Sequence, residues 1–309
     1  MKKFITIMSA IMLLLVMSAC GKKESGSESK KEDKKVAILT PFLSSVTTKQ
    51  MVDEIEKGAK DKGWTVNTID TNGDVGALAS RMEDVISSNV DAIVLVSTDP
   101  NQVKSQIKMA KDKGIHVFGS DASYIEGMTL NATSDNAEMS RMITEYLVEQ
   151  IGEEGNLIVF THRPHPGVLK RTEVLDEILK EHPGIKVIAE QEIKVPGPIE
   201  NARQQMENLL LANKDENAIT AVWAGWDEPA IGAAQAINAA GRNNIIVTGI
   251  DGNSQAVEMI EKGSPIKATV KQNFVGMADI VIEQMDKVFS GGEVDSTEMY
   301  APAELIEGK

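Results

Sequence analysis

Polar side chains that could bind or activate a small molecule gather in six short segments of the chain. Carboxylates, hydroxyls, imidazoles and an indole recur there, and such groups hydrogen-bond hydroxyls and pack on apolar ring faces. None of the segments contains the glycine-rich phosphate loops or the G-x-S-x-G elbow of known catalytic motifs. The residue types therefore favour ligand binding over catalysis. The six segments are TPFLSS (40–45), STD (97–99), GSDAS (119–123), THRPHPG (161–167), GWDEP (225–229) and IDGNS (250–254).

Each of these segments follows a short apolar, β-branched run that is typical of a buried strand. Amphipathic runs at 51–63, 100–114 and 200–213 alternate with the strands and predict helices. Two successive β-α-β series predict an α/β fold with two doubly wound parallel-sheet lobes, in which ligands bind at the carboxyl ends of the strands. The predicted strands are 35–40, 65–70, 92–97, 115–120, 156–161, 185–193, 218–224, 244–250 and 266–270.

The first 20 residues have the layout of a secretory signal. Lys2 and Lys3 precede an apolar run at 4–17, which is too short to span a bilayer as a helix. The run MSACG around Cys20 resembles the bacterial lipobox, which implies a lipid on Cys20 at the mature N-terminus. The alternative is an ordinary signal peptide followed by a chance cysteine. Cys20 is the only cysteine in the chain, which excludes an internal disulfide.

Composition and charge limit the kinds of partner that the rest of the chain can bind. The polar segment 21–34 has no aromatic or β-branched residue and predicts a flexible tether. Residues 1–35 hold eight lysines and four acidic residues, which gives them a formal charge of +4. The whole 309-residue chain has a formal charge of −14, so the residues after 35 carry −18. A body this acidic repels nucleic acid and anionic lipid, so neither is expected to bind it directly.

Six motifs, in this order along the chain, resemble those of the ribose-binding-protein-like group of periplasmic sugar-binding proteins, the solute receptors of bacterial ABC importers. The resemblance implies the type I periplasmic-binding-protein fold, in which a three-strand hinge joins two lobes that close on a sugar without cofactor, metal or catalysis. The motifs are DAIVLVSTDP (91–100), GIHVFGSDA (114–122), NATSDN (131–136), AVWAGWDEPAIGAAQAINAAGR (221–242), VTGIDGNSQAVEMIEKG (247–263) and IKATVKQN (266–273).

The resemblance also implies where the chain passes between the lobes. Crossings are expected near 132–135, 271–273 and 295–299, and a helix at 274–290 should return to the N-terminal lobe. The predicted domains are a lipoprotein signal peptide (1–20), a tether (21–34), an N-terminal lobe (35–133 plus 272–296) and a C-terminal lobe (134–271 plus 297–309).

Three predicted ligand-binding residues match the family directly. Asp121 and Asp251 stand where the family has ligand carboxylates, which accept strong hydrogen bonds from sugar hydroxyls. Gln272 stands at the family's hinge glutamine. The alternatives are a helix or turn cap for Asp121, an Asx-turn for Asp251 and a solvent-exposed hinge amide for Gln272.

Other family contacts are replaced in this chain. Ala122 stands where the ribose proteins have an arginine after the aspartate, and Gly197 stands at the aromatic of the C-terminal lobe. In the first loop Ser45 falls near the family's asparagine and Thr47-Thr48 at its two aromatics. Phe42 is the only aromatic near that loop. We expect Phe42 and Ser45 to contact the ligand.

The segment THRPHPGVLKR (161–171) covers the family's ligand arginine, whose aligned position is Leu169. One interpretation is that Arg163 or a histidine of this basic segment faces the cleft and binds ligand oxygens, including a carboxylate. The other is a solvated loop with a structural Arg171. A His162-x-x-His165 metal pair has weak support, because no third ligand is evident.

The stretch VWAGWDEP contains two of the three tryptophans of the chain. Trp223 lies within a predicted strand and is expected in the core. Trp226 falls where the ribose proteins bind ligand through an asparagine, so we expect it to project into the cleft as a stacking surface. Asp227 is expected to cap the next helix.

These features predict an extracytoplasmic, lipid-anchored receptor that passes a sugar, polyol or sugar acid to an ABC permease. The same module could instead report its ligand to a chemoreceptor or sensor kinase. A transcription-factor effector domain is disfavoured by the export signal and the missing DNA-binding headpiece. A hydrolase is disfavoured because no nucleophile–base unit is present.

Overall fold

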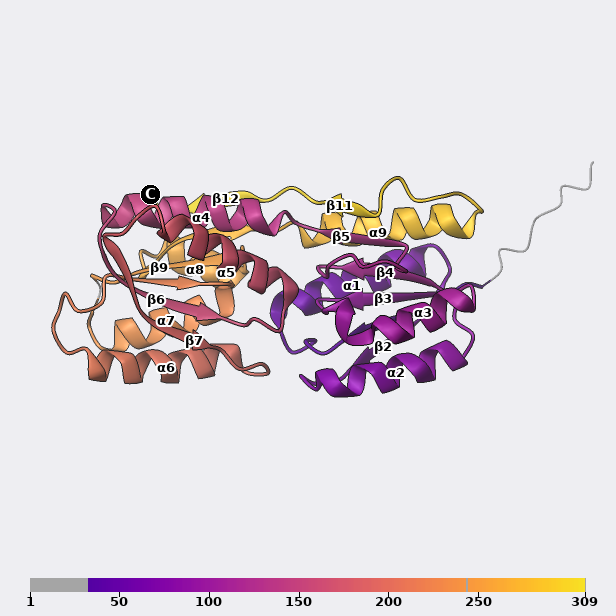
Figure 1. Cartoon of the computed structure of the whole chain (residues 1–309), viewed down its shortest axis with the longest axis horizontal. Helices are drawn as coiled ribbons and strands as arrows, with labels where there is room; N and C mark the ends of the chain where they lie inside the picture. The colour runs from indigo at the N-terminus through magenta and orange to yellow at the C-terminus, as the bar shows by residue number, and fades with distance from the viewer. Residues whose placement is uncertain (1–32, 243, 309) are drawn as a thin grey trace, which may run out of the picture. The chain divides into compact units, whose positions relative to one another are not determined.

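The computed structural model describes residues 33–242 and 244–308, shown in Figure 1. The predicted signal segment, Cys20 and the tether as far as residue 32 lie outside the described residues. The chain from Asp33 onward forms one compact unit. None of the helices described is long and apolar enough to cross a membrane.

The first six-stranded sheet has the order β11-β5-β4-β3-β1-β2, and every neighbouring pair is parallel. Helices α1 (Val46–Asp61) and α9 (Phe274–Phe289) pack on one face, while α2 (Val75–Ser87), the 3-10 turn η1 (Pro100–Val103) and α3 (Lys104–Asp112) cover the other (Figure 1). The strands are β1 (Lys35–Thr40), β2 (Thr65–Asp70), β3 (Ala92–Val96), β4 (His116–Ser120), β5 (Leu130–Thr133) and β11 (Glu298–Tyr300).

The second six-stranded sheet has the order β12-β10-β9-β8-β6-β7 and is parallel except for β12. Helices α4 (Asn136–Ile151) and α5 (Pro166–Leu179) lie on one face, and α6 (Pro198–Ala212), α7 (Asp227–Ala239) and α8 (Ser254–Glu261) on the other. The strands are β6 (Gly155–Thr161), β7 (Ile185–Glu192), β8 (Ala221–Ala224), β9 (Ile246–Asp251), β10 (Ile266–Lys271) and β12 (Glu304–Glu307). The predicted two-lobed α/β fold is confirmed.

Three chain segments connect the two sheets. The first joins β5 to α4, the second joins β10 to α9, and both end at a helix cap that satisfies free N–H groups. Asp135 accepts from Ala137 and Glu138 at the start of α4, and Asn273 accepts from Gly276 at the start of α9. Capping therefore fixes where the chain turns into each lobe.

The third connection lies later than the sequence predicted. Residues 298–300 form β11 and pair with β5, Met299 opposite Ala132, so they belong to the N-terminal lobe rather than to the C-terminal lobe. The crossing at 295–299 is therefore wrong, and the chain passes over between Tyr300 and Glu304. The short strands β5, β11 and β12 were absent from the predicted set, because their strand character arises from their neighbours in the sheet.

Trp223 is a core residue of the second lobe. Its side chain is fully buried among α4, β6 and β9 residues, and its indole N–H donates to Thr144 Oγ1 over 3.1 Å. The hydrogen bond satisfies the polar end of an otherwise apolar ring, as buried tryptophans require.

We expect Trp223→Ala to lower the free energy of unfolding by about 3–5 kcal/mol, because truncating a buried aromatic leaves a cavity. Urea denaturation followed by circular dichroism measures the loss. Leu211→Ala is the matched control, since Leu211 is 69% exposed and should change stability by less than about 0.5 kcal/mol. An unchanged midpoint for Trp223→Ala would show that this indole contributes nothing to the core.

Candidate functional site

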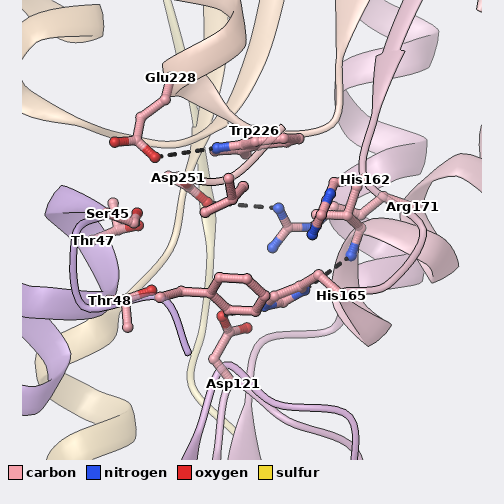
Figure 2. A pocket seen from close by; sticks show the side chains of 13 residues that line it. Ser45, Thr47, Thr48, Asp121, His162, His165, Arg171, Trp226, Glu228 and Asp251 are labelled. Atoms are coloured by element: carbon pink, nitrogen blue, oxygen red, sulfur yellow. Dashed lines mark hydrogen bonds and ion pairs between the residues drawn. The ribbon is translucent and has the colours of Figure 1, made fainter. Parts of the chain in front are cut away.

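A cavity lies where the carboxyl ends of strands from both sheets meet, and Figure 2 shows the side chains around it. Both lobes contribute to its walls, as the fold predicts for a ligand site. Its lining comprises Phe42, Ser45, Thr47, Thr48, Asp121, His162, His165, Val168, Arg171, Val195, Trp226, Glu228 and Asp251.

The N-terminal lobe supplies a carboxylate whose position is fixed by a chain of hydroxyls. Thr48 Oγ1 donates to Ser97 Oγ over 3.3 Å, and Ser97 Oγ donates to Asp121 Oδ2 over 3.1 Å. Asp121 is 7% exposed, and its Oδ1 has no partner among the described residues. Burial raises the pKa of Asp121, but the hydrogen bond from His165 and the charge of Arg171 outweigh it, so this pKa lies below its ordinary value. Asp121 is therefore an anion with one free acceptor atom.

The predicted first-loop contacts also line the cavity. Phe42 and Ser45 are both buried, and Ser45 is the residue that precedes α1. The Ser45 side chain makes no cap bond to its own helix. It hydrogen-bonds the hydroxyl of Thr47 and the carboxylate of Glu228 from the other lobe.

The C-terminal lobe supplies a second buried carboxylate at the end of β9. Asp251 Oδ1 accepts from Gln272 Nε2 over 2.8 Å and lies 3.6 Å from Arg171 Nη1. Burial raises the pKa of Asp251 well above its ordinary value, although Arg171 opposes the shift. Gln272 is not part of the cavity lining. Its amide donates to Asp251, a carboxylate of the lining, and a direct contact of Gln272 with ligand stays a prediction.

Arg171 is a site residue that sequence reasoning assigned only a structural role. Its side chain is 1% exposed yet reaches the cavity, with Nε donating to Asn136 Oδ1 and Nη1 to the Gly225 carbonyl, both over 2.8 Å. A signal was available, since Arg171 shares the buried stripe of α5 with Val168 and Leu175 at helical spacing. A cation on an apolar stripe indicates a paired, buried charge.

Arg163 does not line this cavity but borders a neighbouring pocket together with Asp99 and Ser123 of the N-terminal lobe. Its guanidinium pairs with Glu190 over 2.7 Å and lies 3.8 Å from Asp176, so it is held on the surface of β7 and α5. Its neighbours His162 and His165 face the cavity instead, which agrees with the alternative that a histidine of this segment does so.

His165 links the two lobes. Its Nδ1 accepts from the backbone N–H groups of Gly167 and Val168 and so caps α5. The ring proton is thereby placed on Nε2, which lies 3.4 Å from Asp121 Oδ2. Among the described residues there is no group of three or more His, Cys, Asp or Glu side chains arranged to hold a metal ion.

His162 stands between two aromatic rings. Its imidazole makes edge contacts with Phe42 at 5.8 Å and with Trp226 at 6.1 Å between ring centroids. Its Nδ1 lies 3.1 Å from the carbonyl of Ile193. Burial lowers the pKa of His162 to about 4, so the ring is neutral at neutral pH.

Trp226 and Glu228 lie side by side on one wall of the cavity (Figure 2). Trp226 is 8% exposed, and its indole N–H donates to Glu228 Oε2 over 3.3 Å. Burial raises the pKa of Glu228, while Ser45, Trp226 and the backbone N–H of Val46 hydrogen-bond the carboxylate and oppose the shift. Glu228 therefore sits against the start of α1, where a negative charge is favoured by the helix dipole.

Asp227 does not cap its helix, contrary to the prediction. It is the first residue of α7 and fully buried, and its carboxylate accepts from the Asn253 N–H and the Thr269 hydroxyl, each over 2.7 Å. Asp227 thus joins α7 to the ends of β9 and β10.

The chain is similar to known proteins in sequence and in fold. The family described as periplasmic binding protein domain matches residues 36–293. The ribose import binding protein of Bacillus subtilis is 29% identical, with 99% of each chain covered, and the D-apiose import binding protein of Actinobacillus succinogenes is 27% identical, with 85% of this chain and 84% of the relative covered. A solute binding protein of Agrobacterium vitis, solved with bound allitol, aligns with a TM-score of 0.85 at 27% identity over 89% of this chain and 96% of that one.

We expect Asp227→Asn to remove a pH dependence of stability. Burial raises the pKa of Asp227 to about 6, above the ordinary value that the unfolded chain retains. Its contribution to stability is therefore full below about pH 4 and falls by on the order of 3 kcal/mol as the pH rises through 6. Urea denaturation of both proteins from pH 4 to pH 7 measures it.

The quantity to compare is the free energy of unfolding of the wild type minus that of Asp227→Asn. It should be largest at pH 4 and shrink toward pH 7. Thr269→Val is a matched control, because it removes one hydrogen bond to the same carboxylate and keeps the titrating group. A difference that stays constant across this range would contradict the assignment of the titration to Asp227.

Proposed function

The chain belongs to the periplasmic binding protein family, and we propose that it captures a monosaccharide or related small polyhydroxy compound and delivers it to the permease of an ABC importer. The family is one of binding proteins, in agreement with the expectation that the chain is not an enzyme. The relatives' names refer to import of ribose and D-apiose, and the Agrobacterium vitis protein holds allitol.

The observation that carries the proposal is that both lobes direct buried acceptors and aromatic rings into one cavity. Asp121 from the first lobe and Asp251 from the second can accept hydrogen bonds from ligand hydroxyls. Phe42 and Trp226 offer apolar faces for the C–H surfaces of a carbohydrate ring or chain. A ligand held by both lobes favours the closed arrangement, because only that arrangement makes both sets of contacts.

Entry of the ligand requires the lobes to move. The cavity measures about 50 Å³, whereas small-molecule sites are typically about 300–1,000 Å³. Two contacts between the lobes border the cavity. Glu228 lies against the start of α1, and His165 Nε2 lies 3.4 Å from Asp121 Oδ2. These contacts must separate or slide when a molecule of sugar size enters.

We also propose that a lipid on Cys20 anchors the protein outside the cytoplasm. The order of basic, apolar and small residues before Cys20 supports this. A single lipid chain gives only marginal membrane binding, so stable attachment needs more than one chain or help from the lysines of the tether.

A ligand screen tests the capture function. We expect at least one sugar, polyol or sugar acid to raise the melting temperature of the Asp33–Lys309 body in proportion to the logarithm of its concentration, because it binds only the native state. Trp226→Ala should weaken that binding about 30-fold or more, as truncation of a buried aromatic anchor does. Leu211→Ala should leave it unchanged. Stabilisation by amino acids or metal ions and by no carbohydrate would refute the proposal.

The anchor has its own test. Full-length protein expressed in bacteria with radiolabelled palmitate should carry label and sediment with membranes, whereas Cys20→Ala should do neither because the thiol that takes the lipid is gone. Cys20→Ser is the matched variant that keeps the size of the side chain. Equal labelling of wild type and Cys20→Ser would contradict the proposed anchor.

A further inference from the structure

The protonation pattern of His162 is set by its neighbour. The Ile193 carbonyl can only accept a hydrogen bond, so the 3.1 Å contact requires a proton on His162 Nδ1. Burial keeps the ring neutral by lowering its pKa to about 4. A neutral imidazole with its proton on Nδ1 has a lone pair on Nε2, which makes Nε2 an acceptor.

That acceptor has no partner. His162 Nε2 is buried and forms no hydrogen bond with any described residue. Leaving a buried polar atom unsatisfied is costly, and such atoms in native proteins call for an explanation. His162 belongs to the cavity lining and sits between Phe42 and Trp226. A donor group on a molecule in this cavity would satisfy it.

A second polar atom of the cavity lining is buried without a hydrogen-bond partner, and it too is an acceptor. Asp121 Oδ1 is buried without a partner, while Asp251 and Glu228 add two more carboxylates to the wall. Three carboxylates and the free imidazole nitrogen therefore face a bound molecule.

Most hydrogen-bond donors that line the cavity already donate to acceptors of the protein. The Thr48 hydroxyl donates to Ser97, and the Trp226 indole N–H donates to Glu228. The His165 Nε2 proton is directed at Asp121. Arg171, the one guanidinium in the lining, donates to Asn136 and Gly225 and lies beside Asp251. The wall therefore complements a ligand that brings donors.

We propose that His162 is a specificity-determining residue whose Nε2 accepts a hydrogen bond from a ligand hydroxyl, so that the site takes neutral polyhydroxy compounds in preference to the matching sugar acids. This inference rests on the proposed function and narrows it. A ligand carboxylate would place acceptors and a negative charge against the two free acceptors, His162 Nε2 and the anionic Asp121 Oδ1, which is the kind of mismatch that excludes wrong partners.

Matched pairs of probes test the preference. Calorimetry on the Asp33–Lys309 body would compare allitol with D-allonate, ribitol with D-ribonate, and D-galactose with D-galacturonate. We expect the neutral member of any binding pair to bind at least about 30-fold more tightly, as expected when buried polar groups are left mispaired. An acid that binds as tightly as its neutral partner, or more tightly, would overturn the inference and leave capture of a polyhydroxy compound intact. Absence of binding by all six probes would count against the proposed function as well.

Variants at the histidine test the residue itself. With the neutral probe that binds, His162→Phe keeps an aromatic ring between Phe42 and Trp226 but removes the acceptor, and should weaken binding about 10-fold to 100-fold. His162→Gln restores an acceptor and should recover most of the affinity. His182→Gln is the matched control, since His182 lies beside Glu153 outside the cavity.

A deoxyfluoro series separates a direct contact from a structural effect. Fluorine replaces a hydroxyl of the same probe without supplying a donor, so one position should weaken binding to the wild type and have little effect in His162→Phe. Loss of the same affinity at every position in both proteins would overturn the direct hydrogen bond, as would unchanged affinity of His162→Phe for the unmodified probe.

Discussion

The positive charge of Arg171 is buried in the C-terminal lobe, and much of the site depends on how that charge is satisfied. An unpaired cation in a protein interior costs several kcal/mol, so its surroundings must be held in place. The guanidinium bonds Asn136, at the start of α4, and Gly225, after β8, and it lies beside Asp251 at the end of β9. Asn136 follows the first crossing, and Gln272 at the second crossing holds Asp251. One network therefore joins the floor of the cavity to two of the three connections between the lobes.

The pKa values of the buried carboxylates around this network are shifted in opposite directions. Asp251 is raised in pKa mainly by burial, and Asp227 likewise, so both hold their protons more tightly than an exposed aspartate. The pKa of Asp121 is lowered, because the hydrogen bond from His165 and the charge of Arg171 overcome the effect of burial. Asp121 therefore offers an anionic acceptor from the N-terminal lobe, while the C-terminal lobe limits how much negative charge it gathers. This division suits a ligand with hydroxyl groups, which neither carries a charge nor needs one opposite it.

Local patterns foretold most of the fold. The strands 35–40 and 65–70 appear with the predicted ends, and each is rich in β-branched residues. The strand LNAT (β5) and the pairing of 298–300 with it were not foreseen, since neither has a sequence signature apart from its partner. The third crossing was misplaced for the same reason.

The sequence predicted those site residues whose side-chain direction follows from their place in a strand or helix. Asp251 ends β9, while Asp121 and Trp226 follow β4 and β8, and all three line the cavity. Arg163 lies in a proline-rich loop whose path is set by the cap that His165 makes on α5, so its direction could not be read from spacing. Gln272 follows β10 at the second crossing, as predicted, and its amide donates to Asp251.

Capture by both lobes at once can be measured directly as a distance between them. Nitroxide labels at Ser80→Cys on α2 and Leu211→Cys on α6 in the Asp33–Lys309 body would report it by pulsed electron paramagnetic resonance, since both positions are exposed. Addition of a neutral polyhydroxy compound that binds should give a single, narrow distance distribution, shifted from that of the free protein, because the ligand contacts both lobes. An identical distribution with and without saturating ligand would contradict closure of the lobes on a captured molecule.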